Sequence, residues 1–200
     1  IISNNSTSDL LFVLQMMNED KLKEILLDTK PLDIEIGFGK GNFVLQKSIM
    51  YKDTNFIGFE VKKGLVIEVE NKIAKNQLEN IYVECSYANI SVESKIPENS
   101  VRNFFVNFPD PWWKKRHFKR RILKEEYIKI FHKALKIGGI IQIRTDVQDY
   151  VDFVEENFSK FDSFKKIEPD LSTDGIRSNR EMLCLREELP IYYISYEKIK

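Results

Sequence analysis

The sequence predicts an α/β fold in which a mostly parallel β-sheet carries helices on both faces. From Leu32 onward, apolar runs typical of buried strands alternate with amphipathic stretches. A glycine-rich turn joins the first strand to the first helix. The chain has 200 residues, of which 42% are hydrophobic and 14 are Phe, enough for one sizeable core. We therefore expect a single domain over residues 32–200, preceded by a polar, partly flexible lead-in at 1–31.

The expected elements follow one another without internal repeats. Residues 10–27 read as a helical or irregular segment ending near Pro31. Apolar runs predict strands at 32–36, 54–60, 81–85, 101–108 and 139–146, with a β-rich tail at 190–197. Helices are expected between them at 42–50, 63–77, 122–136 and 147–158. We expect Gly138 and Gly139 to end the third of these helices.

Cysteine, histidine and hydropathy patterns exclude several classes of protein. Cys85 and Cys184 form no CxxC pair, which argues against a disulfide scaffold and fits a reducing, cytoplasmic setting. His117 and His132 are too few for a His-based metal site, so no metal is expected. No apolar run approaches the roughly 18 residues needed to span a bilayer. We expect a cytoplasmic monomer or homodimer that does not enter the membrane.

The net charge of zero conceals one strongly basic segment, residues 114–124. It reads KKRHFKRRILK, with seven Lys and Arg and no acid. Without those seven, the 31 basic residues of the chain fall to 24, against 31 acidic residues. A block of one sign on an otherwise acidic protein favours contact with a polyanion, although a plain basic surface or a protein-binding site is the alternative.

The glycine turn, Gly37 to Gly41, indicates a nucleoside cofactor. Glycines at a strand–helix turn allow a ligand close to the backbone, and Glu60 ends the next strand, where an acid can accept ribose hydroxyls. NAD(P) sites favour GxGxxG, which binds pyrophosphate. Here the spacing is GxGxG, with Glu35 two residues ahead. An acid there suits the cations of S-adenosylmethionine better than pyrophosphate, and a turn without ligand is the third alternative.

The loop after the fourth strand reads NFPDPWW and runs directly into the basic segment. Two prolines around Asp110 stiffen the loop and remove two backbone donors. Trp112 offers a face on which a base can stack. We expect Asp110 at the sheet edge, facing the glycine turn; a simple proline turn with Asp110 as a helix cap is the alternative.

With these motifs in view, the chain resembles the bacterial tRNA (guanine-N7-)-methyltransferases, the TrmB family. The resemblance rests on IEIGFGKG, FIGFEV, NFPDPWWKKRHFKRR and IQIRTD, and extends from about Leu32 to Tyr196. It implies a Rossmann-like class I S-adenosylmethionine-dependent methyltransferase fold with a mostly parallel seven-stranded sheet. It also implies methyl transfer from S-adenosylmethionine to N7 of guanine 46 in the tRNA variable loop.

The resemblance also implies site residues. Cofactor-binding residues would be Glu35, Gly37, Gly39, Gly41, Glu60, Tyr87, Ala88, Asn89 and Asp110. Asp110 would be the catalytic acid, and Lys114, Asp146, Ser178 and Glu181 would contact the substrate. The RNA would meet Arg116, His117, Lys119, Arg120 and Arg121. Tyr87 stands where the family often has Asp or Asn, and Arg180 where its Thr-x-aromatic-Glu motif has an aromatic residue.

Two other functions remain open at this point. One is an amino-group methyltransferase of DNA or RNA, although such enzymes place the acid before two adjacent prolines rather than between them. The other is an RNA-binding module without catalysis. Guanine N7 carries a lone pair and no proton, so methylation there needs no general base, and catalysis should come from positioning and electrostatics.

Overall fold

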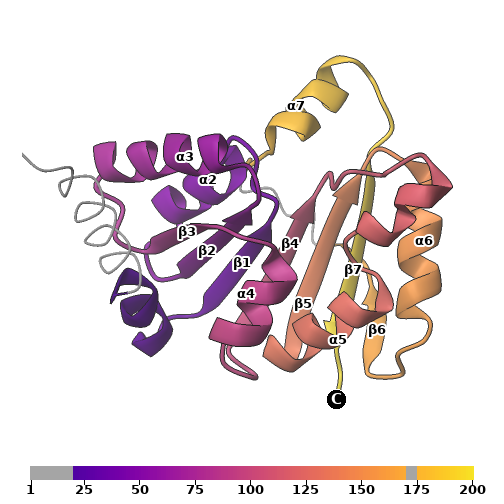
Figure 1. Ribbon diagram of the computed structural model, residues 1–200, viewed down its shortest axis with the longest axis horizontal. Helices are drawn as coiled ribbons and strands as arrows, with labels where there is room; N and C mark the ends of the chain where they lie inside the picture. The colour runs from indigo at the N-terminus through magenta and orange to yellow at the C-terminus, as the bar shows by residue number, and fades with distance from the viewer. Residues whose placement is uncertain (1–19, 170–174) are drawn as a thin grey trace, which may run out of the picture.

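One sheet of seven strands organises the protein, shown in Figure 1 as a computed structural model that describes residues 20–169 and 175–200. The strand order is β3-β2-β1-β4-β5-β7-β6. The strands are β1 (Leu32–Ile36), β2 (Asn55–Glu60), β3 (Ile81–Cys85), β4 (Val101–Asn107), β5 (Leu135–Thr145), β6 (Phe164–Ile167) and β7 (Tyr192–Lys198). Strands β1 to β5 pair in parallel, and β7 runs antiparallel to both β5 and β6. The predicted mostly parallel sheet is confirmed.

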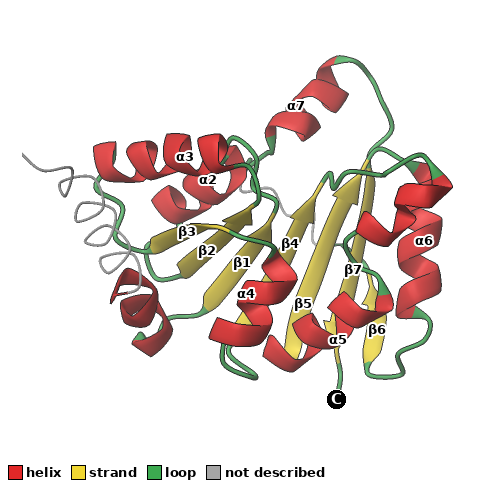
Figure 2. Ribbon diagram, in the orientation of Figure 1, coloured by secondary structure: helices red, strands yellow, loops and turns green. Residues whose placement is uncertain are grey.

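Helices cover both faces of this sheet (Figure 2). They are α2 (Asn42–Met50), α3 (Lys63–Lys75), α4 (Ala88–Lys95), α5 (Glu125–Ala134), α6 (Gln148–Phe158) and α7 (Asn179–Arg186), with a 3₁₀ helix η1 (Lys115–Arg120). Helices α4, α5 and α6 share the main hydrophobic cluster with one face of the sheet. Helices α2 and α3 pack on a second cluster. Val66, Val69 and Ile73 all face that cluster, as the periodicity of α3 predicts.

Alternation along the central strands separates an apolar face from a polar one. In β1, Ile34 and Ile36 enter the main cluster, so Asp33 and Glu35 point to the opposite face. In β4, Phe104 and Val106 do the same, which leaves Asn107 on the side of Glu35. Because β1 and β4 are parallel, with Ile36 opposite Val106, their carboxyl ends meet at one edge of the sheet. This edge collects the polar side chains of the site.

The junction between α5 and β5 differs from our prediction. The helix ends at Ala134, and β5 begins at once with Leu135. Gly138 and Gly139 lie inside the strand, where the register with β4 shifts. Gly138 has φ +77°, and a Cβ on Gly139 would come within 2.8 Å of the Arg102 carbonyl oxygen. The two glycines therefore form a bulge in the strand rather than a helix stop.

Other parts of the chain add to the predicted order. Helices α4 and α7, the 3₁₀ helix and β6 were not predicted. Residues 20–27 are helical, and Leu22 and Ile25 join the main core, whereas residues 1–19 of the expected lead-in lie outside the described part. Over residues 20–169 and 175–200, no helix is long and apolar enough to cross a membrane.

Candidate active site at the carboxyl edge of the sheet

The glycine turn forms the floor of the candidate site. Gly37, Gly39 and Gly41 have φ values of +74°, +56° and +76°, a left-handed conformation that glycine adopts without strain. A Cβ on Gly37 or Gly39 would meet nothing within 4 Å, so the backbone is open to a ligand there. On Gly41 it would meet the Val69 side chain at 2.5 Å. The third glycine therefore lets α3 pack closely, while the first two face the site.

A cavity of about 300 Å³ opens above this turn. It brings together the glycine turn, the start of α2, the end of β4 and the start of α7. Its lining consists of Glu35, Gly37, Phe38, Gly39, Lys40, Asn42, Phe43, Asn107, Phe108, Ser178, Asn179 and Arg180. Three predicted cofactor residues and one predicted substrate residue, Ser178, thus share one cavity.

Glu35 is the most unusual group in this cavity. Its side chain is 3% exposed, and Oε1 accepts a hydrogen bond from Asn107 Nδ2 at 2.9 Å. Its other oxygen, Oε2, is the one buried side-chain polar atom in the described chain that lacks a hydrogen-bond partner. Burial raises the pKa of Glu35 to about 7, against the lowering effect of the Asn107 hydrogen bond. A buried, unpaired carboxylate oxygen lining a cavity fits a cationic ligand.

Glu60 braces the glycine turn in this structure. Its Oε2 accepts a hydrogen bond from the Gly39 backbone at 3.0 Å, and Oε1 accepts from the backbones of Val61 and Lys62. The carboxylate is 8% exposed and does not line the cavity. The expected adenine-side residues follow β3, with Tyr87 exposed, Asn89 half-buried and Ala88 buried. They lie at the same edge of the sheet but outside the cavity lining.

Helix α7 reaches the cavity because buried charges hold it on the sheet. Glu181 is fully buried and accepts from Arg144 Nη1 at 2.7 Å and from the Tyr193 hydroxyl at 2.9 Å. Arg177 Nη1 lies 3.4 Å from the same carboxylate. The Ser178 hydroxyl accepts from the Glu181 backbone and caps the helix. Glu181 thus anchors α7 and is not exposed for direct contact with a substrate.

Asp146, at the end of β5, also contacts α7. Its Oδ2 accepts from both Nε and Nη2 of Arg180, the former at 3.2 Å. Only 15% of the Asp146 side chain is exposed. Lys114, the remaining predicted substrate residue, is exposed and precedes the 3₁₀ helix.

The loop that carries Asp110 leaves β4 next to the cavity. Phe108, which lines the cavity, has φ +49°, and Trp112 has φ +48°, so left-handed residues bracket the two prolines. The Phe108 backbone donates to the Arg144 carbonyl at 2.7 Å. Asp110 itself is exposed, and its charge acts on the hydroxyl of Tyr150. Asp110 therefore lies two residues after the cavity-lining Phe108, and its carboxylate is accessible to solvent.

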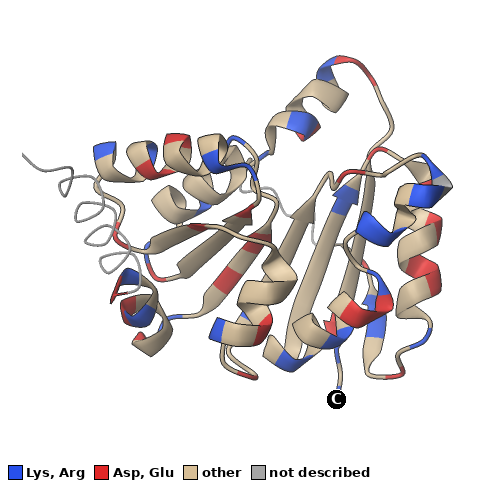
Figure 3. Cartoon of the chain, in the orientation of Figure 1, with Lys and Arg blue, Asp and Glu red and all other residues tan. Residues whose placement is uncertain are grey.

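The basic segment lies beside this loop, and Figure 3 shows its Lys and Arg positions as blue ribbon near α6. Lys114, Arg116, Lys119 and Arg120 are exposed. The half-buried His117 lies edge-on to Trp112, with ring centroids 5.8 Å apart, and Arg120 lies over the same indole at 5.0 Å. The Trp112 ring is therefore already in contact with His117 and Arg120 of the basic segment.

Arg121 corrects our expectation of a surface RNA contact. It is only 3% exposed, and its Nε donates to the Pro111 carbonyl at 2.7 Å. Its guanidinium lies over Phe118 at 3.8 Å and over Phe153 of α6 at 5.1 Å. Periodicity cannot reveal this, because the sequence shows only another Arg in a basic run. In the structure Arg121 ties the Asp110 loop to α6 instead of facing solvent.

The sequence interpretation also missed Asn107, Arg144 and Arg180. Asn107 and Arg144 occupy polar positions at the carboxyl ends of buried parallel strands, a signal that strand alternation could have revealed. Arg180 was noted only as a departure from the family motif. Its role depends on α7, whose place over the cavity follows from long-range ion pairs.

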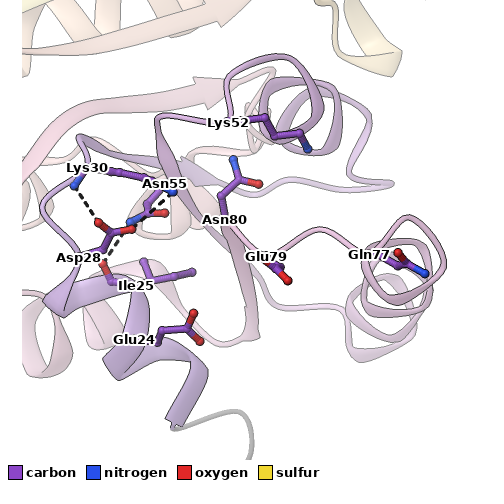
Figure 4. A pocket seen from close by; sticks show the side chains of 9 residues that line it. All are labelled: Glu24, Ile25, Asp28, Lys30, Lys52, Asn55, Gln77, Glu79 and Asn80. Carbon is purple, nitrogen blue, oxygen red and sulfur yellow. Dashed lines mark hydrogen bonds and ion pairs between the residues drawn. The ribbon is translucent and has the colours of Figure 1, made fainter.

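A larger cavity, about 460 Å³, lies at the opposite end of the strands (Figure 4). Two of its polar side chains are engaged: Asn80 Nδ2 donates to three backbone carbonyls, and Asp28 interacts with Lys30 and Asn55. Ligands of open α/β sheets bind at the carboxyl ends of strands. In the described residues no group of three or more His, Cys, Asp or Glu could hold a metal ion. We therefore place the site at the cavity that contains Glu35.

Comparisons with known proteins identify the family of the chain. A family described as "Putative methyltransferase" matches residues 29–191. A tRNA (guanine-N(7)-)-methyltransferase of Prochlorococcus marinus subsp. pastoris is 32% identical, covering 84% of this chain and 86% of that protein. One of Aquifex aeolicus is 34% identical over 84% of this chain, which spans 57% of that relative's length.

Solved structures show the same fold at low sequence identity. The antibiotic-resistance methyltransferase Kmr superposes with a TM-score of 0.62 at 16% identity, over 90% of this chain and 92% of that one. The aminoglycoside resistance methyltransferase NpmB1 gives a TM-score of 0.60 at 18% identity, with the same coverage. The predicted Rossmann-like class I methyltransferase fold is confirmed.

Proposed function

The chain belongs to the family of tRNA (guanine-N(7)-)-methyltransferases, and from this we propose that it methylates N7 of guanine 46 in the tRNA variable loop, using S-adenosylmethionine. The observation that carries the proposal is the unpaired, buried oxygen of Glu35 in a cavity floored by the glycine turn. The Asp110 loop and the exposed cations follow the wall of the same cavity. A cytoplasmic monomer or homodimer acting on tRNA is part of the proposal.

The residues of the cavity fit S-adenosylmethionine. Its ammonium and sulfonium groups suit Glu35, and the open backbone at Gly37 and Gly39 allows close approach. When bound, the cofactor supplies an electrophilic methyl group. Tyr87, Ala88 and Asn89 follow β3, on the side where we place the adenine.

In the proposed reaction bound S-adenosylmethionine would supply its methyl group to guanine N7, which carries a lone pair and no proton, and would leave as the neutral thioether. The purine gains positive charge, which the Asp110 carboxylate offsets while it accepts from guanine N1–H and the exocyclic amine. Lys114 and Asp146 would hold the substrate near this point, and no side chain has to remove a proton from N7.

Cofactor affinity should depend on pH through Glu35. Because its pKa is about 7, and a bound ammonium favours the ionised form, affinity should rise about fivefold from pH 6 to pH 7, below the range in which an α-amino group itself titrates. Arg144 and Glu60 are the other charges that act on it, and neither His117 nor His132 lines the cavity. The contribution of Glu35 to the free energy of unfolding changes with pH in the opposite direction to cofactor affinity. This contribution is greatest at low pH and falls as pH rises from 4.5 through about 7.

Calorimetry of S-adenosylmethionine binding across this range tests the assignment. The Glu35→Gln variant should bind more weakly at pH 7 and lose the rise between pH 6 and pH 7. An equal pH dependence in parent and variant would show that another group titrates.

Binding of tRNA should be strongly dependent on salt. If the four exposed cations, Lys114, Arg116, Lys119 and Arg120, each meet a phosphate, log K should fall against log salt with a slope of about −3 to −4. Filter binding between 50 and 200 mM salt, chosen as the usual range for such titrations, measures the slope. A slope near zero would remove the basic segment from the RNA interface.

The decisive experiment for the proposed function is incubation with unmodified tRNA and methyl-labelled cofactor. The labelled base is then located by cleavage at 7-methylguanosine. Label at N7 of guanine 46 supports the proposal, label on an exocyclic amine favours the amino-group methyltransferase, and tRNA binding without any transfer of label favours the RNA-binding module.

A further inference from the structure

The lining of the cavity carries charges of both signs, from two different elements. Glu35 comes from β1 and is buried. Arg180 is the second residue of α7 and lines the cavity together with its neighbours Ser178 and Asn179. A ligand that contacts both side chains must present a cation to Glu35 and an anion to Arg180.

Arg180 is held in place rather than free to move. Asp146 accepts from its Nε and Nη2, and about half of its side chain is exposed. The helix that carries it is anchored by the fully buried Glu181, which accepts hydrogen bonds from Arg144 and Tyr193. Both hydrogen bonds to Asp146 use one side of the guanidinium, so other N–H groups remain for a ligand. A cation fixed in this way loses little conformational entropy when it binds.

Lys40, the third charged residue of the lining, is less suited to this role. Its side chain is exposed, and its charge adds to that of Lys72, the main cause, in lowering the pKa of Glu68 in α3. Arg180 therefore provides the fixed positive charge of the cavity.

We propose that Arg180 binds the carboxylate of the cofactor's amino-acid end while Glu35 takes its ammonium. The inference rests on the proposed function, because it assumes S-adenosylmethionine in this cavity. An α-amino acid carries these two opposite charges on one carbon, and the cavity provides a partner for each. Since Asp146 holds Arg180, the same contact links the cofactor site to the place where the substrate is proposed to bind.

The test compares S-adenosylmethionine with its decarboxylated analogue by calorimetry in the absence of tRNA. The parent should bind the analogue about 5- to 20-fold more weakly, as expected for a charge-assisted contact at a partly exposed site. Arg180→Met should lose a similar factor for S-adenosylmethionine and almost nothing for the analogue. Arg180→Lys should recover part of the affinity for the carboxylate-bearing ligand only.

Arg186→Met is the matched control, because Arg186 lies at the other end of α7 with 72% of its side chain exposed. It should leave both affinities within about twofold. If Arg180→Met lost the same affinity for both ligands, or lost none, the inference would be overturned. No loss of affinity would indicate that Arg180 binds a phosphate of the RNA instead. A parent protein that binds neither ligand would instead refute the cofactor assignment itself.

Discussion

Replacement of Asp110 by alanine should lower kcat for methyl transfer by at least about 10²-fold while leaving cofactor and tRNA binding near the parent values. The side chain is exposed, and among residues 20–169 and 175–200 it makes no hydrogen bond or ion pair. Its loss should therefore change the unfolding free energy by no more than about 0.5 kcal/mol. An acid in a stiffened loop that stabilises nothing in the free protein is available for a substrate.

Single-turnover kinetics with bound tRNA separate chemistry from binding in this experiment. Asp110→Asn keeps the shape but loses the charge, and it should be nearly as slow as the alanine variant. Asp149→Ala is the control, since Asp149 is another exposed acid without a partner in the described chain, in the first turn of α6. If Asp110→Ala weakened tRNA binding as much as it slowed transfer, the residue would be a binding contact and not part of the reaction centre.

Local patterns predicted several short elements at the bounds that the structure shows. The strands at 32–36 and 81–85 and the helix at 42–50 are found at their predicted bounds. The predictions from sequence failed where tertiary contacts determine the local structure. Helix α7 has a weakly apolar sequence and forms on the sheet because Glu181 meets Arg144 and Tyr193, residues far from it along the chain. The two glycines of β5 read as a stop signal, but close approach to the Arg102 carbonyl makes them a bulge.

The candidate site was predicted in part, for a similar reason. A glycine turn and an acid at the end of a strand are local signals, so Glu35, Gly37 and Gly39 were found from the sequence. Whether a polar side chain faces a ligand or a neighbour depends on what packs against it. Glu60 holds backbone N–H groups, and Glu181 holds a helix, although both are acids in motif positions. Hydrogen-bond partners, which the sequence does not state, distinguish an anchoring acid from one that keeps an oxygen for the ligand, as Glu35 does.

Arg120 and Arg121 offer the sharpest case of this distinction, because two adjacent, identical residues should respond in opposite ways. Arg121→Met should lower the unfolding free energy by about 1.5–3 kcal/mol, as it leaves the Pro111 carbonyl without its charged donor and removes a guanidinium packed on Phe118. It should also lower kcat, since the Asp110 loop loses its link to α6. Chemical denaturation and single-turnover kinetics measure the two effects.

Arg120→Met should instead leave stability within about 0.5 kcal/mol, weaken tRNA binding, and make the salt slope shallower by about one. Its guanidinium is exposed over Trp112 and has no buried partner to lose. Arg121→Met should keep the parent slope, because a buried guanidinium displaces no counterion from a phosphate. If Arg121→Met proves too unstable to assay, Arg121→Lys retains the charge and tests the slope alone. A shallower slope in either Arg121 variant, with stability unchanged, would place Arg121 on the RNA and contradict its burial. The two variants therefore separate two roles within one basic segment. The exposed Arg120 binds the RNA phosphates, and the buried Arg121 holds the loop that carries Asp110.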